Sequence, residues 1–224
     1  FYDFTFSPPK SVSVAALVGS DERIVTAHRA AVSVAVTELE RFASVQVHGK
    51  VRSPDRTTSN IVAALFEHET SRALDPHLHT HCIVFNATHD ASDARWKALH
   101  NYEMLAAQKF VENVYYHELA GALRSLGYSV VNSARGDFHL AEVPREICNR
   151  FSKRHREIDE KTRALLDARP EMKGRNVKEV RDHIAHNKRS RKMHAVPREE
   201  LRRVIDALSD RGVIGAVQRD LFHQ

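Results

Sequence analysis

Hydrophobic and polar positions change their spacing several times along the chain. The first six residues alternate, with Phe4 and Phe6 on one side and Asp3 and Thr5 on the other, which is typical of a half-buried strand. Further runs are short and either alternating or rich in β-branched residues, and we expect strands there: 45–51, 61–67, 78–87, 128–132 and 138–143. The pattern predicts a sheet of about five strands.

Apolar residues at helical spacing separate these runs. The helices expected from this spacing are 10–17, 20–42, 101–126, 145–168, 177–190 and 197–211. Ser20 is the expected N-cap of the second helix. Gly127 directly follows the helix expected over 101–126, and glycine commonly ends a helix at this position. Strands separated by long helices predict an α+β fold, in which an antiparallel or mixed sheet is covered by helices.

Composition narrows the class of protein. The chain has 224 residues, of which 42% are hydrophobic and 28% charged, and this mix excludes a disordered or fibrous chain. No apolar run approaches the roughly 20 residues that a membrane-spanning helix needs. Two cysteines, Cys82 and Cys148, exclude a disulfide framework and fit a reducing compartment, so we expect a cytoplasmic protein.

Charge is divided unevenly. Residues 1–143 carry a net charge of −3, whereas residues 144–224 carry +8. We therefore expect two parts: a core over 1–143, and a basic helical extension over 144–224 that packs on the core and contacts a polyanion such as DNA. A solvated helical surface laced with salt bridges is the alternative reading of the same charges.

Histidines are concentrated in one stretch, where six of the fifteen fall between residues 68 and 100. His79 and His81 share one face of an expected strand, so they can bind one divalent ion. A third ligand must come from elsewhere, and we favour His68 on the preceding strand. His77 is the competing ligand, but three successive alternating positions span about 13 Å, too far to converge on one ion. Histidine ligands favour Zn, Mn, Ni or Co over Mg, although the pattern does not choose among them.

Several segments together resemble one family, the conjugative relaxases of the TrwC/TraI (MobF) type within the HUH endonucleases. The resemblance lies in Asp-Phe-Thr-Phe-Ser-Pro-Pro-Lys-Ser-Val-Ser (3–13), His-Glu-Thr-Ser-Arg-Ala-Leu-Asp-Pro-His-Leu-His-Thr-His (68–81), Trp-Lys-Ala-Leu (96–99), Leu-Gly-Tyr (126–128) and Phe-Ser-Lys-Arg (151–154). It extends over most of residues 1–155. The joined string from 68 to 81 is its most specific part.

The resemblance implies a five-stranded antiparallel sheet and an ion held by His68, His79 and His81. It also implies that a tyrosine attacks a phosphodiester of single-stranded DNA at an origin of transfer, giving a 5′-phosphotyrosyl link and a free 3′-hydroxyl. Asp3 matches the family's acidic residue, which orients a ligand histidine or helps to deprotonate the tyrosine. A helicase domain in the full-length protein and relaxosome accessory proteins are the implied partners.

The nucleophile is the point of departure. In this family the catalytic tyrosines lie upstream of the Asp-x-Thr-Phe-Ser motif, and this chain begins two residues before that motif. We therefore expect the nucleophile to be absent and the fragment to bind metal and DNA without nicking. Tyr115 and Tyr116 look like a catalytic pair but fall in an expected helix, where core packing is the simpler interpretation. Tyr2 should point away from Asp3.

Four basic residues are the expected DNA contacts: Lys10 and Arg72 near the ion, and Lys153 and Arg154 in the basic extension. Trp96 could stack on a base or close a hydrophobic core.

Three other functions remain open at this point. A rolling-circle replication initiator or a transposase of the HUH class would carry similar chemistry, although the acidic strand here precedes the histidines as in relaxases. A zinc-dependent hydrolase would need a general base near the ligands, for which Glu67 and Glu69 are available. A binding module without chemistry is the third.

Overall fold

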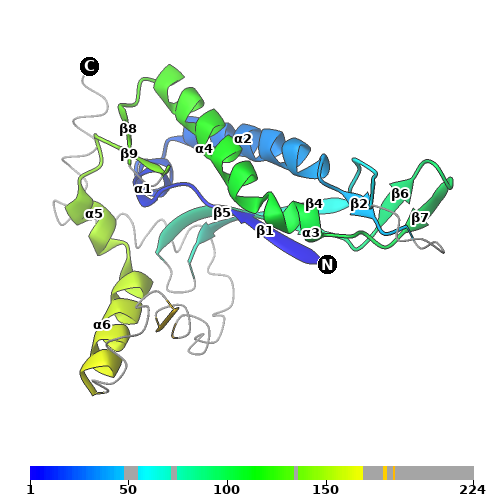
Figure 1. Ribbon diagram of the computed structural model, residues 1–224. Helices are drawn as coiled ribbons and strands as arrows, with labels where there is room; N and C mark the ends of the chain where they lie inside the picture. Colours follow the sequence, from blue (N-terminus) through cyan, green and yellow to red (C-terminus); the bar gives the residue numbers. More distant parts are fainter. Residues whose placement is uncertain (48–54, 72–74, 134–135, 169–178, 181–183, 185–224) are drawn as a thin grey trace. The chain divides into compact units, whose positions relative to one another are not determined.

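The computed structural model describes residues 1–47, 55–71, 75–133, 136–168, 179–180 and 184 (Figure 1). Its contacts divide the chain into two compact units. The first unit comprises Phe1–Glu69 and His77–Val143, and the second comprises Thr70–Pro76 and Pro144–Gln224. Within the described residues, no helix combines the length and the apolar character needed to cross a membrane.

The first unit contains nine strands and four helices among its described residues. The strands are β1 (Tyr2–Phe6), β2 (Ser44–Val45), β3 (Arg56–Thr57), β4 (Ala63–Thr70), β5 (Pro76–Val84), β6 (Thr88–Asp90), β7 (Arg95–Lys97), β8 (Val130–Asn132) and β9 (Phe138–Leu140). The helices are α1 (Lys10–Leu17), α2 (Glu22–Glu40), α3 (Tyr102–Ala106) and α4 (Gln108–Ser125). The mixture of strands and helices confirms the predicted α+β class.

Three strands form the sheet that carries the histidines, in the order β1-β5-β4. β1 pairs antiparallel with β5, so that Thr5 lies opposite His81 and Phe6 opposite Thr80. Along β5 buried and half-buried positions alternate throughout the strand. The buried row includes Leu78 and Cys82, both fully inaccessible, and it faces the core, while the histidines occupy the other face.

Helices α2 and α4 lie side by side over this sheet (Figure 1) and pack extensively against each other. Both bury apolar residues at helical spacing, as in Ile24 and Leu39 of α2 and Leu119 and Leu123 of α4. The N-cap of α2 is Asp21, whose carboxylate accepts the backbone N–H of Arg23 at 3.0 Å. The prediction that Ser20 caps this helix was therefore wrong by one residue.

The expected helix over 101–126 is two helices. A break at Ala107 separates α3 from α4, and no glycine or proline announces it in the sequence. The predicted end is confirmed, because α4 ends at Ser125 with Leu126 as its C-cap, and Gly127 follows with a φ of +96°. This left-handed backbone strains any residue with a Cβ atom, which explains a glycine there. The next residue is Tyr128, whose hydroxyl donates to Asp21 Oδ2 at 2.7 Å.

The remaining strands do not join the three-stranded sheet within the described residues. They form two-stranded ribbons, β2-β3, β6-β7 and β8-β9, so the expected single sheet of about five strands is divided. Each of these strands is two or three residues long and pairs with one partner. No strand was predicted at β3, β6 or β7, because such short strands show too little alternation to be recognised.

Two buried serines of α1 link separate parts of the first unit. The hydroxyl of Ser13 accepts the backbone N–H of Leu78 in β5, and that of Ser11 accepts the N–H of Leu140 in β9. Both serines are almost inaccessible to solvent. Because buried backbone N–H groups need acceptors, these bonds fix β5 and the β8-β9 ribbon against α1.

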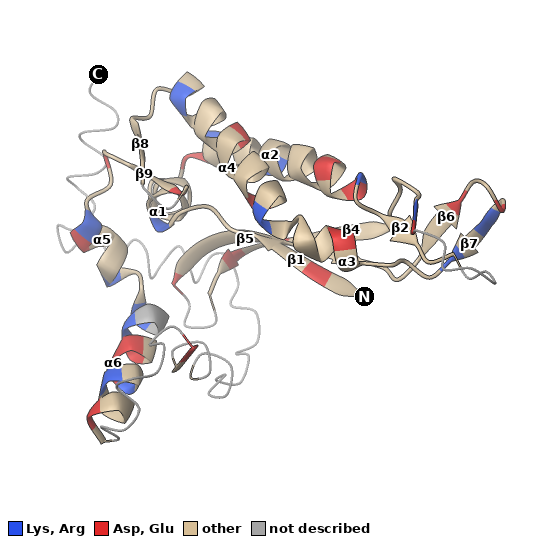
Figure 2. Cartoon of the chain, in the orientation of Figure 1, with Lys and Arg blue, Asp and Glu red and all other residues tan. Residues whose placement is uncertain are grey.

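In the second unit, Asp75 lies against the start of a helix. The predicted helix over 145–168 is divided into α5 (Arg145–Arg150) and α6 (Lys153–Ala168), and Asp75 Oδ2 accepts the backbone N–H of Lys153 at 2.8 Å. A carboxylate there satisfies an otherwise unpaired N–H and complements the helix dipole. Basic and acidic residues are interspersed along α6 (Figure 2). Residues 144–168 carry a net charge of +2, so most of the basic excess, together with the helices expected over 177–190 and 197–211, falls outside the fully described residues.

Asp21 should be important for the stability of the first unit, because it caps α2 and also accepts the buried Tyr128 hydroxyl. We expect Tyr128→Phe to lower the free energy of unfolding by about 1–2 kcal/mol through loss of one buried hydrogen bond. Asp21→Ala should lower it by about 2–3 kcal/mol, because the helix cap is lost as well. Urea denaturation followed by circular dichroism measures both values.

Arg23→Ala is the matched control. Its guanidinium group also bonds to Asp21, but the side chain is 60% exposed, and an exposed ion pair contributes little to stability. A loss for Arg23→Ala as large as that for Asp21→Ala would contradict the assignment of stability to the buried cap.

Candidate metal centre

Pairing of β1 with β5 brings an acidic residue against a histidine. Asp3 and Thr5 lie on one face of β1, and the register sets Thr5 opposite His81. His81 Nδ1 lies 3.0 Å from both carboxylate oxygens of Asp3 and 3.0 Å from Thr5 Oγ1. Thr5 in turn donates to Asp3 Oδ1 at 3.2 Å. The carboxylate therefore holds the imidazole through Nδ1.

The three histidines expected as ligands lie together. The ring centroids of His79 and His81 are 5.1 Å apart, and the ring of His68, from β4, lies 5.3 Å from His79 and 5.6 Å from His81. His77, the competing ligand, stacks on His79 at 4.6 Å and lies two residues further along β5 from His81. The ring contacts of His68 with both partners make it the better-placed third residue.

The hydrogen bonds of two of these histidines define which nitrogen faces outward. His79 Nδ1 lies 2.9 Å from the carbonyl oxygen of His77, and His81 Nδ1 is held by Asp3. In both rings Nδ1 therefore carries the proton, and Nε2 is the nitrogen with a lone pair to offer. Burial lowers the pKa of His79 below its ordinary value, which favours the neutral form that metal binding requires.

Three imidazole nitrogens are suitable ligands for a transition metal, but the rings of His68, His79 and His81 do not point at a common centre. A centroid lies about 3 Å from an ion bound through one ring nitrogen, so separations of about 5 Å suit three imidazoles around one ion. However, His68 stacks on His79 with only 29° between the ring planes, and two nearly parallel rings do not aim at one point. Accordingly, no three His, Cys, Asp or Glu side chains among the described residues have ligand geometry as they stand. Rotation of the exposed His68 side chain is the adjustment that an ion would require.

The five tyrosines, all of which are described, have hydrogen-bond or ring partners other than His79 and His81. Tyr115 is fully buried, and its burial raises the pKa of its phenol well above the ordinary value. Burial also raises the pKa of Tyr116 to about 12 and, together with the bond to Asp21, that of Tyr128. A raised pKa disfavours the phenolate, so these three are poor nucleophiles.

The two remaining tyrosines make contacts with residues other than Asp3. Tyr2 is next to Asp3 in β1 and therefore points to the opposite face, where its hydroxyl lies 3.5 Å from Asn86 Oδ1. Tyr102 begins α3 and is stacked on His100. The interpretation of Tyr115 as a core residue is confirmed.

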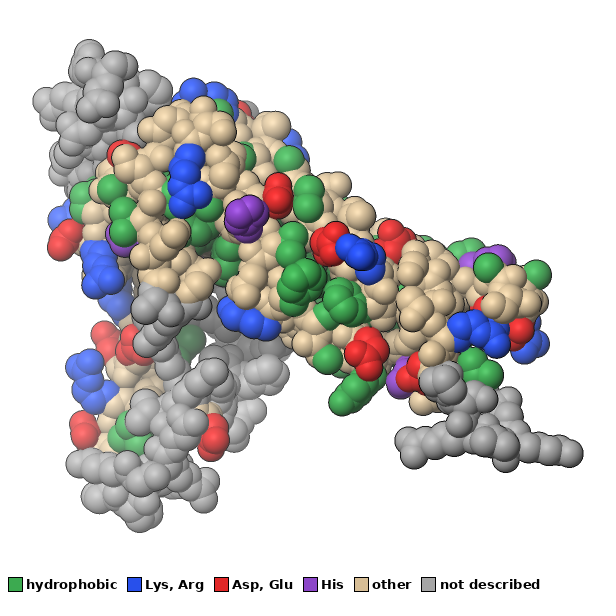
Figure 3. All heavy atoms as spheres, turned by 45° about the horizontal axis from the view of Figure 1, so that its top comes forward, with side chains coloured by type: hydrophobic (Ala, Val, Ile, Leu, Met, Phe, Trp, Pro, Cys, Tyr) green, Lys and Arg blue, Asp and Glu red, His purple; other side chains and the backbone are tan. Residues whose placement is uncertain are grey.

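The basic residues expected to contact DNA occupy different places. Lys10 is the first residue of α1, directly after Pro8-Pro9, and Lys153 is the exposed first residue of α6 in the second unit. Arg72 lies outside the described residues, as does the side chain of Arg154. On the face drawn in Figure 3, Lys and Arg side chains are interspersed with Asp and Glu. The role of these four residues stays a prediction.

Glu67 is not available as a general base. It alternates with His68 along β4 and so lies on the other face of the strand. Its carboxylate accepts two hydrogen bonds from the Arg29 guanidinium group, at 2.7 and 2.9 Å. Glu69 also alternates with His68 in β4 and so shares the face of Glu67. Because neither glutamate lies on the histidine face, the zinc-dependent hydrolase is disfavoured.

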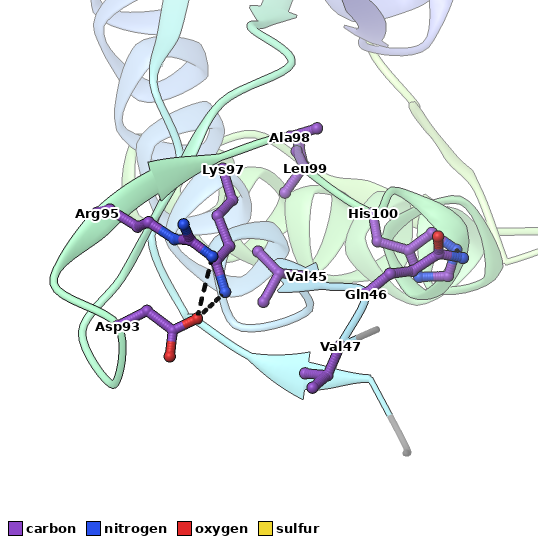
Figure 4. A pocket seen from close by; sticks show the side chains of 9 residues that line it. All are labelled: Val45, Gln46, Val47, Asp93, Arg95, Lys97, Ala98, Leu99 and His100. Atoms are coloured by element: carbon purple, nitrogen blue, oxygen red, sulfur yellow. Dashed lines mark hydrogen bonds and ion pairs between the residues drawn. The ribbon is translucent and has the colours of Figure 1, made fainter. Parts of the chain in front are cut away.

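The cavity drawn in Figure 4 is separate from the histidine cluster. Its volume is about 400 Å³, and its lining includes Val45, Gln46, Lys97 and His100. The candidate ligands His68, His79 and His81 do not line it. Trp96 belongs to the adjacent β6-β7 ribbon and is 61% exposed, so its interpretation as a buried core residue was wrong.

Sequence reasoning missed two sets of residues around the site. Thr5 contacts both Asp3 and His81, and the Asp-x-Thr spacing in a strand is the signal that places it there. On the other face of β5, Thr80 is bonded to His28 of α2, a contact that no local pattern announces.

The known proteins that this chain resembles are relaxases or conjugation proteins. The family model for the TrwC relaxase matches residues 1–210. The multifunctional conjugation protein TraI of Escherichia coli (strain K12) is 34% identical over 234 aligned positions, which cover 100% of this chain and 12% of TraI. The chain thus spans a small part of that curated relative.

Solved structures show the same likeness. The conjugative relaxase TrwC in complex with OriT DNA, in a metal-free structure, is 36% identical with a TM-score of 0.83, and the match covers 93% of this chain and 72% of the chain in that structure. A metal-bound TrwC structure with OriT DNA is 36% identical with a TM-score of 0.82, covering 93% and 70%. These matches confirm the predicted relaxase-like fold, and, with the family model matching most of the sequence, the chain belongs to the TrwC relaxase family.

Proposed function

We propose that this chain is the metal-binding part of a conjugative relaxase that nicks one strand of origin-of-transfer DNA. The observation that carries the proposal is the Asp3–His81 contact beside His68 and His79. A carboxylate that holds Nδ1 of a histidine is the usual support of a metal ligand. The TrwC structures named above, with bound OriT DNA and in one case bound metal, support the same function.

One divalent ion, held by His68, His79 and His81, is the proposed cofactor. When bound, it would supply positive charge to the non-bridging oxygens of the scissile phosphate. Asp3 and Thr5 would keep His81 in the tautomer that presents Nε2, and the carbonyl of His77 would do the same for His79. The identity of the ion, Mg, Mn, Zn, Ni or Co, is outside the proposal.

The proposed reaction is a transesterification. A tyrosine phenol oxygen attacks the scissile phosphorus, a bond from tyrosine to the 5′-phosphate forms, and the bond to the 3′ oxygen breaks. The phenol proton leaves, and the 3′ oxygen takes up a proton to become a hydroxyl. Asp3 is 40% exposed on the histidine face and could receive the phenol proton.

The nucleophile is proposed to lie outside the five tyrosines of this chain. Support comes from the raised pKa values of Tyr115, Tyr116 and Tyr128, and from the direction of Tyr2 away from Asp3. The full protein would therefore contribute another tyrosine to the histidine face.

DNA contacts are proposed for Lys10, Arg72, Lys153 and Arg154, with the core over 1–143 and a basic extension over 144–224 that packs on it. We further propose that the full-length protein works in the bacterial cytoplasm, with a helicase domain and relaxosome accessory proteins as partners. The much greater length of TraI, described as multifunctional, supports further domains.

Substitution of one ligand should strongly weaken metal binding. We expect His79→Ala to weaken binding of Co²⁺ or Ni²⁺ by about 100-fold or more, because two imidazoles cannot replace a three-ligand site. His77→Ala is the matched control from the same strand face, and its affinity should stay near that of the original chain. Isothermal titration calorimetry measures both. A larger loss for His77→Ala than for His68→Ala would contradict the proposed ligand set.

Asp3→Asn should weaken metal binding without removing a ligand. An amide accepts the His81 N–H less strongly than a carboxylate does, and loss of such support typically reduces affinity about 10–100-fold. The same titration reports the change, with circular dichroism to verify folding. Unchanged affinity in a folded Asp3→Asn protein would show that the Asp3–His81 contact does not serve the ion.

Single-stranded origin DNA should bind to the chain without being nicked and without forming a covalent adduct with it. Fluorescence anisotropy should show an affinity that falls with rising salt, because phosphate contacts release counterions. Incubation with origin DNA and Mn²⁺ should give no protein–DNA adduct on a denaturing gel. An adduct would contradict the absence of the nucleophile, and its loss in Tyr2→Phe, but not in Tyr102→Phe, would assign that role to Tyr2.

A further inference from the structure

A buried hydrogen-bonded chain lies behind the histidine strand. His28 of α2 is fully inaccessible; its Nε2 lies 2.8 Å from Thr80 Oγ1 in β5, and its Nδ1 lies 2.8 Å from the Tyr115 hydroxyl in α4. Thr80 is 4% exposed and Tyr115 fully buried. Three elements are therefore joined through one imidazole at the centre of the core.

Both ring nitrogens of His28 have a hydrogen-bond partner. Burial lowers the pKa of His28 to about 4, so the ring is neutral at physiological pH, with one nitrogen donating and the other accepting. A hydroxyl can fill either role, and Tyr115 and Thr80 together satisfy both nitrogens. Removal of one hydroxyl leaves a buried nitrogen without its partner, which is unfavourable.

Thr80 is also the only hydroxyl in an otherwise apolar row. The buried positions of β5 are Pro76, Leu78, Thr80, Cys82 and Val84. Because this pattern repeats every two residues, sliding the strand by two residues would keep apolar side chains against α2 and α4. Such a slide would move the histidines by about 7 Å along the sheet. The Thr80–His28 bond distinguishes the observed position from the shifted one, since it forms only there.

We propose that His28 is a positioning residue for the candidate metal centre. By joining Thr80 to Tyr115, it fixes β5 along its own axis and so holds His79 and His81, the neighbours of Thr80 on the opposite face, where they meet His68. The inference rests on the proposed role of these histidines in binding metal. It assigns a function in the site to residues that touch neither the ion nor DNA.

Thr80→Val and His28→Leu test the inference, because both remove the bond and keep much of the side-chain volume. Tyr128→Phe is the matched control: it also removes one buried hydrogen bond, to Asp21, but from a place outside β5. Each variant is titrated with Co²⁺ at a temperature at which circular dichroism shows it to be folded. We expect affinity to fall about tenfold or more in Thr80→Val and His28→Leu and to be unchanged in Tyr128→Phe.

A second measurement in the absence of metal separates this inference from the proposed function. Amide cross-strand NOEs report the pairing of Thr5 with His81 and Phe4 with Cys82. We expect these NOEs to weaken, or a shifted set to appear, in Thr80→Val but not in Tyr128→Phe. Altered NOEs in a chain whose original form binds no Co²⁺ would support positioning by His28 and overturn the metal centre. Unchanged NOEs together with unchanged affinity in folded Thr80→Val and His28→Leu would overturn the positioning role.

Discussion

Antiparallel pairing of β1 with β5 is the constraint on which the candidate site depends. Its register sets Thr5 opposite His81 and places Asp3 on the same face, where the carboxylate reaches His81 Nδ1. The same alternation directs Thr80 into the core, where His28 holds it. A shift of one residue would exchange the two faces of β5, burying histidines and exposing apolar side chains. The register that buries the apolar face of β5 is therefore also the register that assembles the site.

Much of this arrangement could be predicted from the sequence, because it depends on local periodicity. The bounds of β1 and α1, the shared face of His79 and His81, and the helix end at Gly127 all follow from spacing or backbone sterics. Features decided by distant contacts could not be predicted. The ring orientation of His68, which meets His79 and His81 of another strand, is such a feature. Strands β3, β6 and β7 were missed because two or three residues show too little alternation.

The string from His68 to His81 combines two structural roles. Its ends contribute imidazoles to the histidine cluster of the first unit, while Thr70–Pro76 belongs to the second. There Asp75 accepts the first backbone N–H of α6, the helix with which the basic extension of the sequence continues. A single stretch therefore carries both the candidate ligands and a helix cap, which gives a physical reason for a long, uninterrupted motif in place of an isolated His-x-His.

The most direct test of the central claim is X-ray absorption spectroscopy of the chain loaded with one equivalent of Zn²⁺. The account predicts three imidazole nitrogens at about 2.0–2.1 Å, with oxygen completing the coordination, and two imidazoles when His68 is replaced by alanine. A first shell made of oxygen, or one with fewer than three imidazoles in the unaltered chain, would contradict it.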